Sequence, residues 1–345
     1  MAATTSSPSP GRSCIRCLLP DTMPGLHIDD NQLCDFCREA PDVEALRAER
    51  IALRREMERV IDERRGATPY EVVVAYSGGK DSSYTLKLLV EHYRLRCIAI
   101  TIDNGFLGDG TLDNCRAVCG ALGVDHMLFT PSRQFTSAMY RKSAEDDRLH
   151  SKAAIKRASA ICSSCIAMIN THMLQQALQL GAPVVAGGYI GGQVPRDGAV
   201  MMIRAGAQGQ RARSAMVERF ASHLGEGVRA YFELPQGREN REIAVINPML
   251  GITVTEEQIV AALTPMGWRR PRDTGVTSTN CRLNDLGVFL HTRRHGFHPY
   301  ALEIAEQVRA GTMSRQEAQA KLQALPRREQ VIPLAKGIGL SEDAL

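Results

Sequence analysis

Residues 70–82, with the sequence YEVVVAYSGGKDS, decide the fold of this chain. The run of valines indicates a buried strand over 70–76, and a helical pattern follows over 82–93. Between them, Gly78 and Gly79 lack a Cβ atom, so successive backbone N–H groups can converge on an anion at the start of the helix. The order of strand, glycine-rich loop and helix predicts a phosphate-binding loop.

The spacing of these glycines excludes two common nucleotide-binding motifs. The loop does not match the G-x-x-x-x-G-K-[ST] pattern of Walker A, nor the G-x-G-x-x-G of dinucleotide-binding folds. From spacing alone, an ordinary turn between a strand and a helix accounts for residues 77–82 equally well.

Further along the chain, strand and helix patterns alternate, which predicts an α/β fold with a parallel sheet covered by helices. The expected elements are strands at 97–102, 126–129 and 183–186, and helices at 111–122, about 134–146 and about 164–180. Beyond about Gly188 the strand pattern fades. The C-terminal region is expected to be mainly helical, with capping boxes at Thr255-x-x-Gln258 and Ser314-x-x-Glu317.

Composition is that of an ordinary globular protein. The chain has 345 residues, 44% of them hydrophobic, and its length suggests roughly two domains. With 42 basic and 38 acidic residues, the net charge of +4 is too small to diagnose nucleic-acid binding. No apolar run approaches the ~18 residues of a membrane span, and the N-terminus lacks the apolar core of a signal peptide. We therefore expect a cytoplasmic protein with no membrane partner.

Four of the ten cysteines follow the spacing of a structural zinc site. Cys14-x2-Cys17 and Cys34-x2-Cys37 are separated by 16 residues, and four thiolates complete the tetrahedral coordination of Zn²⁺. Four unrelated buried cysteines are the alternative. The expected divisions are a disordered tail at 1–13, a zinc module at 14–41, a linker helix at 42–66 capped by Asp42, a nucleotide-binding domain at 67–200 and a mainly helical substrate region at 201–345.

The string AYSGGKDS after a valine-rich strand resembles the PP-loop of the N-type ATP pyrophosphatases, the adenine nucleotide α-hydrolase superfamily. The resemblance implies a Rossmann-like domain that cleaves ATP between the α and β phosphates, with Mg²⁺, and adenylates a carbonyl oxygen. It implies that 77–82 hold the pyrophosphate portion and that Lys80 neutralises developing charge. Asp103 is equally well explained as a turn residue. The positions assigned to the nucleotide are Ala75, Tyr76, Ser77, Gly78, Gly79, Lys80, Asp81, Ser82, Asp103 and Gly187.

A second cysteine group distinguishes branches of that family. Cys162-x2-Cys165 and the distant Cys281 resemble the three ligands of the cluster-bearing tRNA thiolation enzymes, in which a [4Fe–4S] cluster lies beside the nucleotide. A helix start and the nearby Lys156 and Arg157 are expected to lower the pKa of these thiols. The alternatives are a persulfide carrier with a resolving thiol, an inert core pair, and half of a second zinc site.

Both ends of the chain resemble the N-acetyl sugar amidotransferases, another PP-loop group. The resemblance lies in CIRCLLPDTMPGLHIDDNQLCDFC, LGVDHMLFTP and HPYALEIAEQVRAGTMSRQEAQAKL. It implies an amidotransferase that uses ammonia from a glutaminase partner. Ammonia chemistry does not require Cys162, Cys165 and Cys281.

These patterns together predict an ATP-dependent sulfurtransferase that replaces a carbonyl oxygen by sulfur and releases AMP and pyrophosphate. The acceptor is expected to be a nucleobase, in tRNA or in a free small molecule. The donor is expected to be sulfide or a sulfur-carrier protein, and the chain could pair as a homodimer. A zinc-bearing binding protein with a vestigial loop is the non-enzymatic alternative, which the intact SGGKDS opposes. The predicted catalytic residues are Lys80, Asp81, Cys162, Cys165 and Cys281.

Overall fold

The structure is a computed structural model in which these ranges are described: 12–40, 43–66, 68–195, 199–204, 207–235, 237 and 241–345. Most of the predicted tail at 1–13, and the predicted cap Asp42, lie outside the described residues.

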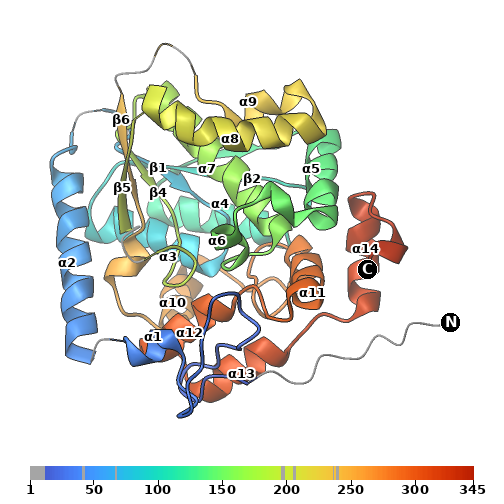
Figure 1. Ribbon diagram of the computed structural model, residues 1–345. Helices are drawn as coiled ribbons and strands as arrows, with labels where there is room; N and C mark the ends of the chain where they lie inside the picture. Colours follow the sequence, from blue (N-terminus) through green and yellow to red (C-terminus); the bar gives the residue numbers. More distant parts are fainter. Residues whose placement is uncertain are drawn as a thin grey trace.

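A six-stranded sheet forms the centre of the protein (Figure 1). The strand order is β3-β2-β1-β4-β6-β5, and every neighbouring pair is parallel except β5 and β6. In β1, Val73 pairs with Ile98 of β2 on one side and with Val185 of β4 on the other. The strands are β1 (Val72–Ala75), β2 (Cys97–Ile102), β3 (Asp125–Phe129), β4 (Val184–Ala186), β5 (Val200–Arg204) and β6 (Glu242–Ile246).

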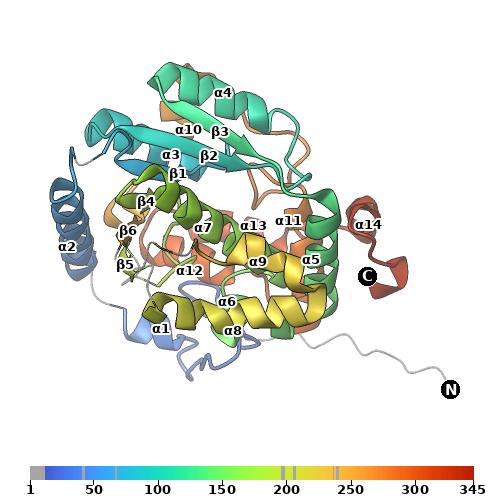
Figure 2. The ribbon, with the colours of Figure 1, turned by 90° about the horizontal axis from the view of Figure 1, so that it is seen from above.

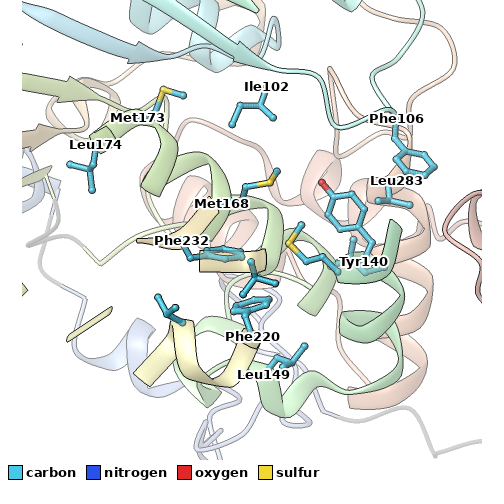
Figure 3. Close-up of a cluster of buried hydrophobic side chains, with 14 of the residues drawn as sticks. Ile102, Phe106, Tyr140, Leu149, Met168, Met173, Leu174, Phe220, Phe232 and Leu283 are labelled. Atoms are coloured by element: carbon cyan, nitrogen blue, oxygen red, sulfur yellow. The ribbon is translucent and has the colours of Figure 1, made fainter. Parts of the chain in front are cut away.

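Alternation along the strands divides the apolar side chains between two cores, because successive residues of a strand point to opposite faces of the sheet. In β1, Val73 belongs to one core, whereas Val72 and Val74 belong to the other. Figure 3 shows part of the first core, where Met168, Phe220 and other side chains pack beneath the sheet. Both faces are therefore buried, as is usual for parallel strands.

Helices cover the two faces, with α4 on one side of the sheet and α7 and α8 on the other (Figure 2). Side chains of the first core come from α5 (Arg133–Glu145), α7 (Ala160–Leu180), α8 (Ala207–Leu224), α9 (Arg229–Phe232), α11 (Leu283–His295) and α14 (Arg328–Gly337). Those of the second come from α2 (Val43–Asp62), α3 (Lys80–Lys87), α4 (Thr111–Leu122) and α10 (Glu256–Leu263).

The N-terminal module, which we define as residues 12–40, packs against the C-terminal helices (Figure 1). It contains α1 (Asp35–Arg38), and its buried side chains share a cluster with α12 (Ala301–Arg309). A short α6 (Lys152–Ile155) and α13 (Arg315–Gln323) complete the α-helices of the described chain. No helix among the described residues is long and apolar enough to cross a membrane.

The α/β fold with a mostly parallel sheet, an N-terminal cysteine module and a helical C-terminal region is confirmed. Both predicted capping boxes are present, at Thr255 and at Ser314. Beyond about Gly188, where the strand pattern fades, β5 and β6 were not predicted, and they extend the sheet beyond β4. The predicted domain boundaries stay a prediction, and the pairing of β4 with β6 crosses the one at residue 200.

Candidate active site

The glycine-rich loop lies at the carboxyl end of β1, where the chain turns into α3. Gly78 has a φ of +72°, a backbone conformation that residues with a Cβ rarely adopt. A Cβ atom at Gly78 would lie 2.7 Å from Cys115 Sγ and 2.8 Å from the backbone oxygen of Thr111. Gly79 is the N-cap residue of α3 and has no side chain to cap it. Beyond Lys80, whose N–H is bonded to Thr279, the first N–H groups of this helix are therefore available to an anion.

The loop occupies the switch point of the sheet. The chain continues from β1 to β2 on one side, whereas β4 lies on the other side of β1, so the connections leave a crevice at the carboxyl ends of β1 and β4. After β4, Gly188 approaches α3 so closely that a Cβ there would lie 2.8 Å from Ser82 Cα. Ligands of open α/β sheets bind in such crevices.

Polar contacts fix the loop from within and from the distant end of the chain. The hydroxyl oxygens of Ser77 and Ser82 lie 3.0 Å apart, and the backbone N–H of Lys80 donates to Thr279 Oγ1 at 3.1 Å. Lys80 Nζ lies 2.8 Å from both carboxylate oxygens of Asp81. Burial acts to lower the pKa of Lys80, but the charges of Asp81 and Glu256 outweigh it and the pKa is raised. Lys80 therefore remains a cation at neutral pH.

Trp268, the only tryptophan of the chain, contacts the glycine-rich loop through its indole ring. Its indole N–H donates to the carbonyl oxygen of Gly78 at 2.9 Å, and the side chain is buried. We expect Trp268→Phe to lower the free energy of unfolding by about 1–3 kcal/mol, because a buried carbonyl loses its partner. Urea unfolding followed by circular dichroism measures this. An unchanged midpoint would mean that the bond does not stabilise the loop.

The loop opens into a cavity of about 280 Å³. Residues from both halves of the chain line it, and they include all the residues predicted for phosphate binding except Gly78, and the three residues predicted as cluster ligands. The lining residues that matter here are Ala75, Tyr76, Ser77, Gly79, Lys80, Asp81, Ser82, Asn104, Tyr140, Cys162, Cys165, Tyr189, Glu256, Thr279, Cys281, Asn284, Tyr300, Glu303 and Lys321.

The three thiols reach this cavity from two elements. Cys162 and Cys165 lie in the first two turns of α7, where Ser159 Oγ accepts from the N–H of Cys162 at 3.2 Å. Cys281 lies before α11, and a single bridge pairs it with Leu107 in the segment after β2. Asn104 Nδ2 lies 3.8 Å from Cys165 Sγ and 3.5 Å from Cys281 Sγ. The long-range convergence that the three-ligand hypothesis requires is therefore present.

One short segment links the thiols to the phosphate loop. Within residues 278–281, Thr279 accepts from Lys80 at the start of α3, and Cys281 follows two residues later. Ser278 Oγ accepts from the N–H of Cys281 at 3.1 Å. The same segment therefore touches the phosphate loop and carries one of the three thiols.

The predicted lowering of the thiol pKa values is wrong for the metal-free protein. Burial raises the pKa of Cys162, of Cys165 to about 11 and of Cys281 to about 12. The helix start does not overcome burial in this cavity, and Arg157 is directed elsewhere, with its Nη1 donating to Gly192 O at 2.7 Å. The thiols are neutral at pH 7, so binding of a metal or cluster must release their protons.

Several cavity residues were not predicted from the sequence. Tyr140 donates to Cys165 Sγ at 3.3 Å, and Asn284 Nδ2 lies 3.6 Å from Cys162 Sγ. Glu303 of α12 accepts from Gln193 Nε2 at 2.9 Å. Burial raises the pKa of Glu303 to about 7, although Lys80 acts to lower it. A carboxyl group in this range can accept or donate a proton near neutral pH.

Three predicted nucleotide contacts lie outside the cavity lining, namely Gly78 of the loop, Asp103 and Gly187. Asp103 follows β2 and its Oδ1 accepts from the N–H of Gly105 at 2.9 Å, which is the geometry of a turn residue. Its neighbour Asn104 lines the cavity instead. Gly187 packs against Asn247 and Tyr189, while Gly188 lines the cavity.

The four N-terminal cysteines form a second, separate centre. Their Sγ atoms all lie within 4.8 Å of one another, and no other group of three or more His, Cys, Asp or Glu ligands in the described ranges meets this spacing. Cys17 Sγ and Cys34 Sγ are 3.5 Å apart, close to the ~3.8 Å that tetrahedral Zn–S bonds of about 2.3 Å imply. Hydrogen bonding, first to Cys17 and then to Cys37, lowers the pKa of Cys34 to about 2. The donor set therefore fits a tetrahedral zinc ion.

The three cavity thiols fit a different kind of group. They do not meet the close spacing of the N-terminal four. In an iron–sulfur cube each thiolate binds a different iron, so the sulfurs stand further apart than around one ion. Asn104 and Asn284 supply N–H donors to the sulfurs, which is how proteins tune such clusters. Three partly buried thiols with these donors fit a cluster with one open iron.

No model of a protein family matches the chain. An uncharacterized protein of Methanocaldococcus jannaschii is 24% identical over 254 residues, which cover 74% of this chain and 73% of that protein. Among solved structures, the U34-tRNA thiolase NcsA of Methanococcus maripaludis with its [4Fe–4S] cluster is similar at 17% identity and a TM-score of 0.32, covering 91% of this chain and 89% of that one. At that TM-score the likeness carries no argument, so the chemistry must be inferred from the cavity itself.

Proposed function

We propose that this chain is an ATP-dependent sulfurtransferase. It adenylates a carbonyl oxygen of a nucleobase, in tRNA or in a related small molecule, and replaces that oxygen by sulfur, releasing AMP and pyrophosphate. The four N-terminal cysteines hold a structural zinc ion, and Cys162, Cys165 and Cys281 hold a [4Fe–4S] cluster. The sulfur comes from sulfide or from a sulfur-carrier protein.

One observation carries the proposal. A phosphate-binding loop and three thiols from distant parts of the chain line the same cavity. A nucleotide-binding protein without sulfur chemistry has no need of this convergence, and neither has an enzyme that transfers ammonia. Cys97, Cys115 and Cys119, by contrast, are buried in the second apolar core away from the cavity.

Different residues of the cavity have different roles in the first step, the adenylation of the acceptor. The loop N–H groups and Lys80 bind the phosphates and stabilise the charge that develops on the leaving pyrophosphate. Mg²⁺ accompanies the ATP. The acceptor oxygen attacks the α-phosphorus, and an amide-type acceptor loses its N–H proton as it becomes the adenylated imidate. Glu303, with a pKa near 7, is placed in the same cavity to take that proton.

The thiols serve the second step. Cys162, Cys165 and Cys281 would hold a [4Fe–4S] cluster by three thiolates, and the cluster would supply the site for the sulfide that replaces the adenylated oxygen. Tyr140, Asn104 and Asn284 hold the sulfurs in place through the contacts described above. AMP then leaves, and the acceptor retains a thiocarbonyl group.

Metal analysis of anaerobically purified protein tests the proposal. We expect about four irons, with acid-labile sulfide, and one zinc per chain. Cys162→Ala, Cys165→Ala and Cys281→Ala should each lose the iron and sulfide and keep the zinc, because each removes one of three ligands. Cys119→Ala is the matched control, since this buried thiol lies outside the cavity and its loss should leave the iron unchanged.

Iron-free wild-type protein containing zinc alone would contradict the cluster. Two alternatives would then remain, persulfide transfer and amidation of an N-acetyl sugar by ammonia from a glutaminase partner. Pyrophosphate release from ATP separates them, measured with a persulfide-bearing sulfur donor and unmodified tRNA transcripts, and with ammonia and a nucleotide-linked N-acetyl sugar.

A further inference from the structure

Three cations, two of them from helices and one from a loop, surround one carboxylate beside the phosphate loop. Glu256, the first residue of α10, lies 2.7 Å from Lys321 Nζ of α13 and 3.0 Å from Arg270 Nη1. Lys80 Nζ of α3 lies 3.9 Å from the same carboxylate. The C-terminal region therefore places Lys321 beside the same carboxylate as Lys80 of the loop, although more than 200 residues separate the two lysines.

Most of this cluster belongs to the cavity, whereas Arg270 is 41% exposed and lies outside the cavity lining. Glu256, Lys80 and Lys321 all line the cavity, and the Lys80 side chain is only 14% exposed. Burial acts to raise the pKa of Glu256, but Lys80, Lys321 and Arg270 outweigh it and the pKa is lowered. The group is thus an ionised carboxylate held by cations.

Lys80 alone is poorly matched to a pyrophosphate group. Asp81 already lies 2.8 Å from its Nζ and offsets its charge. A pyrophosphate leaving group carries several negative charges on many oxygens, and enzymes that release it stabilise this charge with more than one cation. Among the described residues, Lys321 and Arg270 are the other two cations that pair with Glu256, the carboxylate that also lies 3.9 Å from Lys80 Nζ.

The helix that carries Lys321 is firmly fixed. A capping box formed by Ser314 and Glu317 begins α13. Ala318 is buried in a small apolar cluster with Ile304 of α12 and with Met313. Lys321 is therefore presented from a rigid element, which suits the preorganised binding of charge.

We propose that Lys321, assisted by Arg270, forms a second half of the pyrophosphate-binding site opposite the SGGKDS loop, and that the Glu256 carboxylate competes with pyrophosphate for these cations. This rests on the proposed cleavage of ATP between its α and β phosphates. The proposal gives the C-terminal helical region a direct part in that cleavage. It predicts that loss of Lys321 weakens pyrophosphate binding and that loss of the Glu256 charge strengthens it.

Isothermal titration of the full-length protein with metal-free inorganic pyrophosphate, and separately with MgATP, tests this. Lys321→Met should weaken binding of pyrophosphate by about tenfold, the effect of losing one charge-assisted contact. Lys321→Arg, which keeps the charge, should retain most of the affinity. Glu256→Gln should tighten binding of metal-free pyrophosphate several-fold because the competing charge is gone.

Lys336→Met is the matched control. Lys336 lies on α14, pairs with Glu342 and is 65% exposed, so its loss should not change pyrophosphate binding. Thermal unfolding of each variant shows that it is folded at the titration temperature.

The outcomes separate the two proposals. Wild-type protein that binds neither pyrophosphate nor MgATP overturns the proposed function, and the second half-site with it. Wild-type protein that binds both, with Lys321→Met binding equally well, overturns only the role of Lys321. Glu256→Gln that weakens binding of MgATP and leaves metal-free pyrophosphate unchanged overturns the competition and identifies Glu256 as a magnesium ligand.

Discussion

Replacing Cys17 by serine should strip the metal from the N-terminal module and lower the thermal unfolding midpoint of the protein by more than any of the other substitutions considered above. Structural zinc contributes about 10–16 kcal/mol of binding free energy to small zinc modules, and three thiolates hold it far less tightly than four. Zinc content by mass spectrometry and the unfolding midpoint by circular dichroism measure the effect. Unchanged zinc content in Cys17→Ser would contradict the four-thiolate site, and Cys119→Ala supplies the control.

Loss of the metal should also affect the cavity, because α12 packs against the N-terminal module and lines the cavity. On one face of this helix, Ala301, Leu302 and Ala305 pack in the cluster of the four cysteines. On its other face, Glu303 and Gln307 line the cavity. Loss of the module removes the packing that holds α12 in place, so we expect Cys17→Ser to weaken ligand binding as well as lower stability.

Arg309 strengthens the link between the module and α12. Its guanidinium is buried, it donates to Glu306 at 2.8 Å, and its Nη1 has no hydrogen-bond partner among the described residues. Burial acts to lower the pKa of Arg309, but Glu306 and Cys17 outweigh it and the pKa is raised. A zinc ion with four thiolates carries a net charge of −2, which this cation partly offsets.

The local motifs were predictable because each is a short pattern with a fixed geometry. The strand before Ser77 and the loop over 77–82 follow from valines, glycines and the start of a helix. The four-cysteine centre follows from two C-x2-C pairs at the spacing of a zinc site. None of these inferences needs a contact between distant parts of the chain.

The strands β5 and β6 were not predicted, because hydrophobic periodicity does not identify either of them. β6 lies between β4 and β5, so its apolar run Ile243–Ile246 is buried from both sides, and such a run cannot be told from a helix segment by pattern alone. β5 is an edge strand in which Met201 and Met202 are both exposed, so no alternation marks it. Their place in the sheet depends on pairing, which the sequence does not display.

The assembly of the cavity was only partly predictable. Cys281 lies near Cys165 because the backbone of residues 280–282 forms hydrogen bonds with that of 106–108. This contact spans more than 170 residues of the sequence. Local features of the sequence favoured lowered thiol pKa values, but burial is a tertiary property and it reversed the direction. Glu303 is one of many glutamates on helices, and only its position in the cavity distinguishes it.

Replacing Gly78 by alanine should abolish the binding of MgATP. At φ +72° an alanine costs about 1–2 kcal/mol from backbone conformation alone. Its Cβ would also lie 2.7 Å from Cys115 Sγ and 2.8 Å from Thr111 O, and the second contact is with backbone at the start of α4, which cannot move as a side chain can. The loop must therefore shift, and with it the N–H groups aimed at the phosphates. Isothermal titration with MgATP measures the loss.

Gly110→Ala separates the two causes. Gly110 also has a positive φ, of +82°, but a Cβ atom there would have nothing within 4 Å. This variant carries the conformational cost without the collision, so its unfolding midpoint should fall while its affinity for MgATP stays close to that of the wild type. If Gly78→Ala bound MgATP as well as Gly110→Ala does, the close packing of the loop against α4 would not matter for the nucleotide. If both lost binding equally, backbone conformation near the cavity, and not the collision with Cys115 and Thr111, would be the controlling feature.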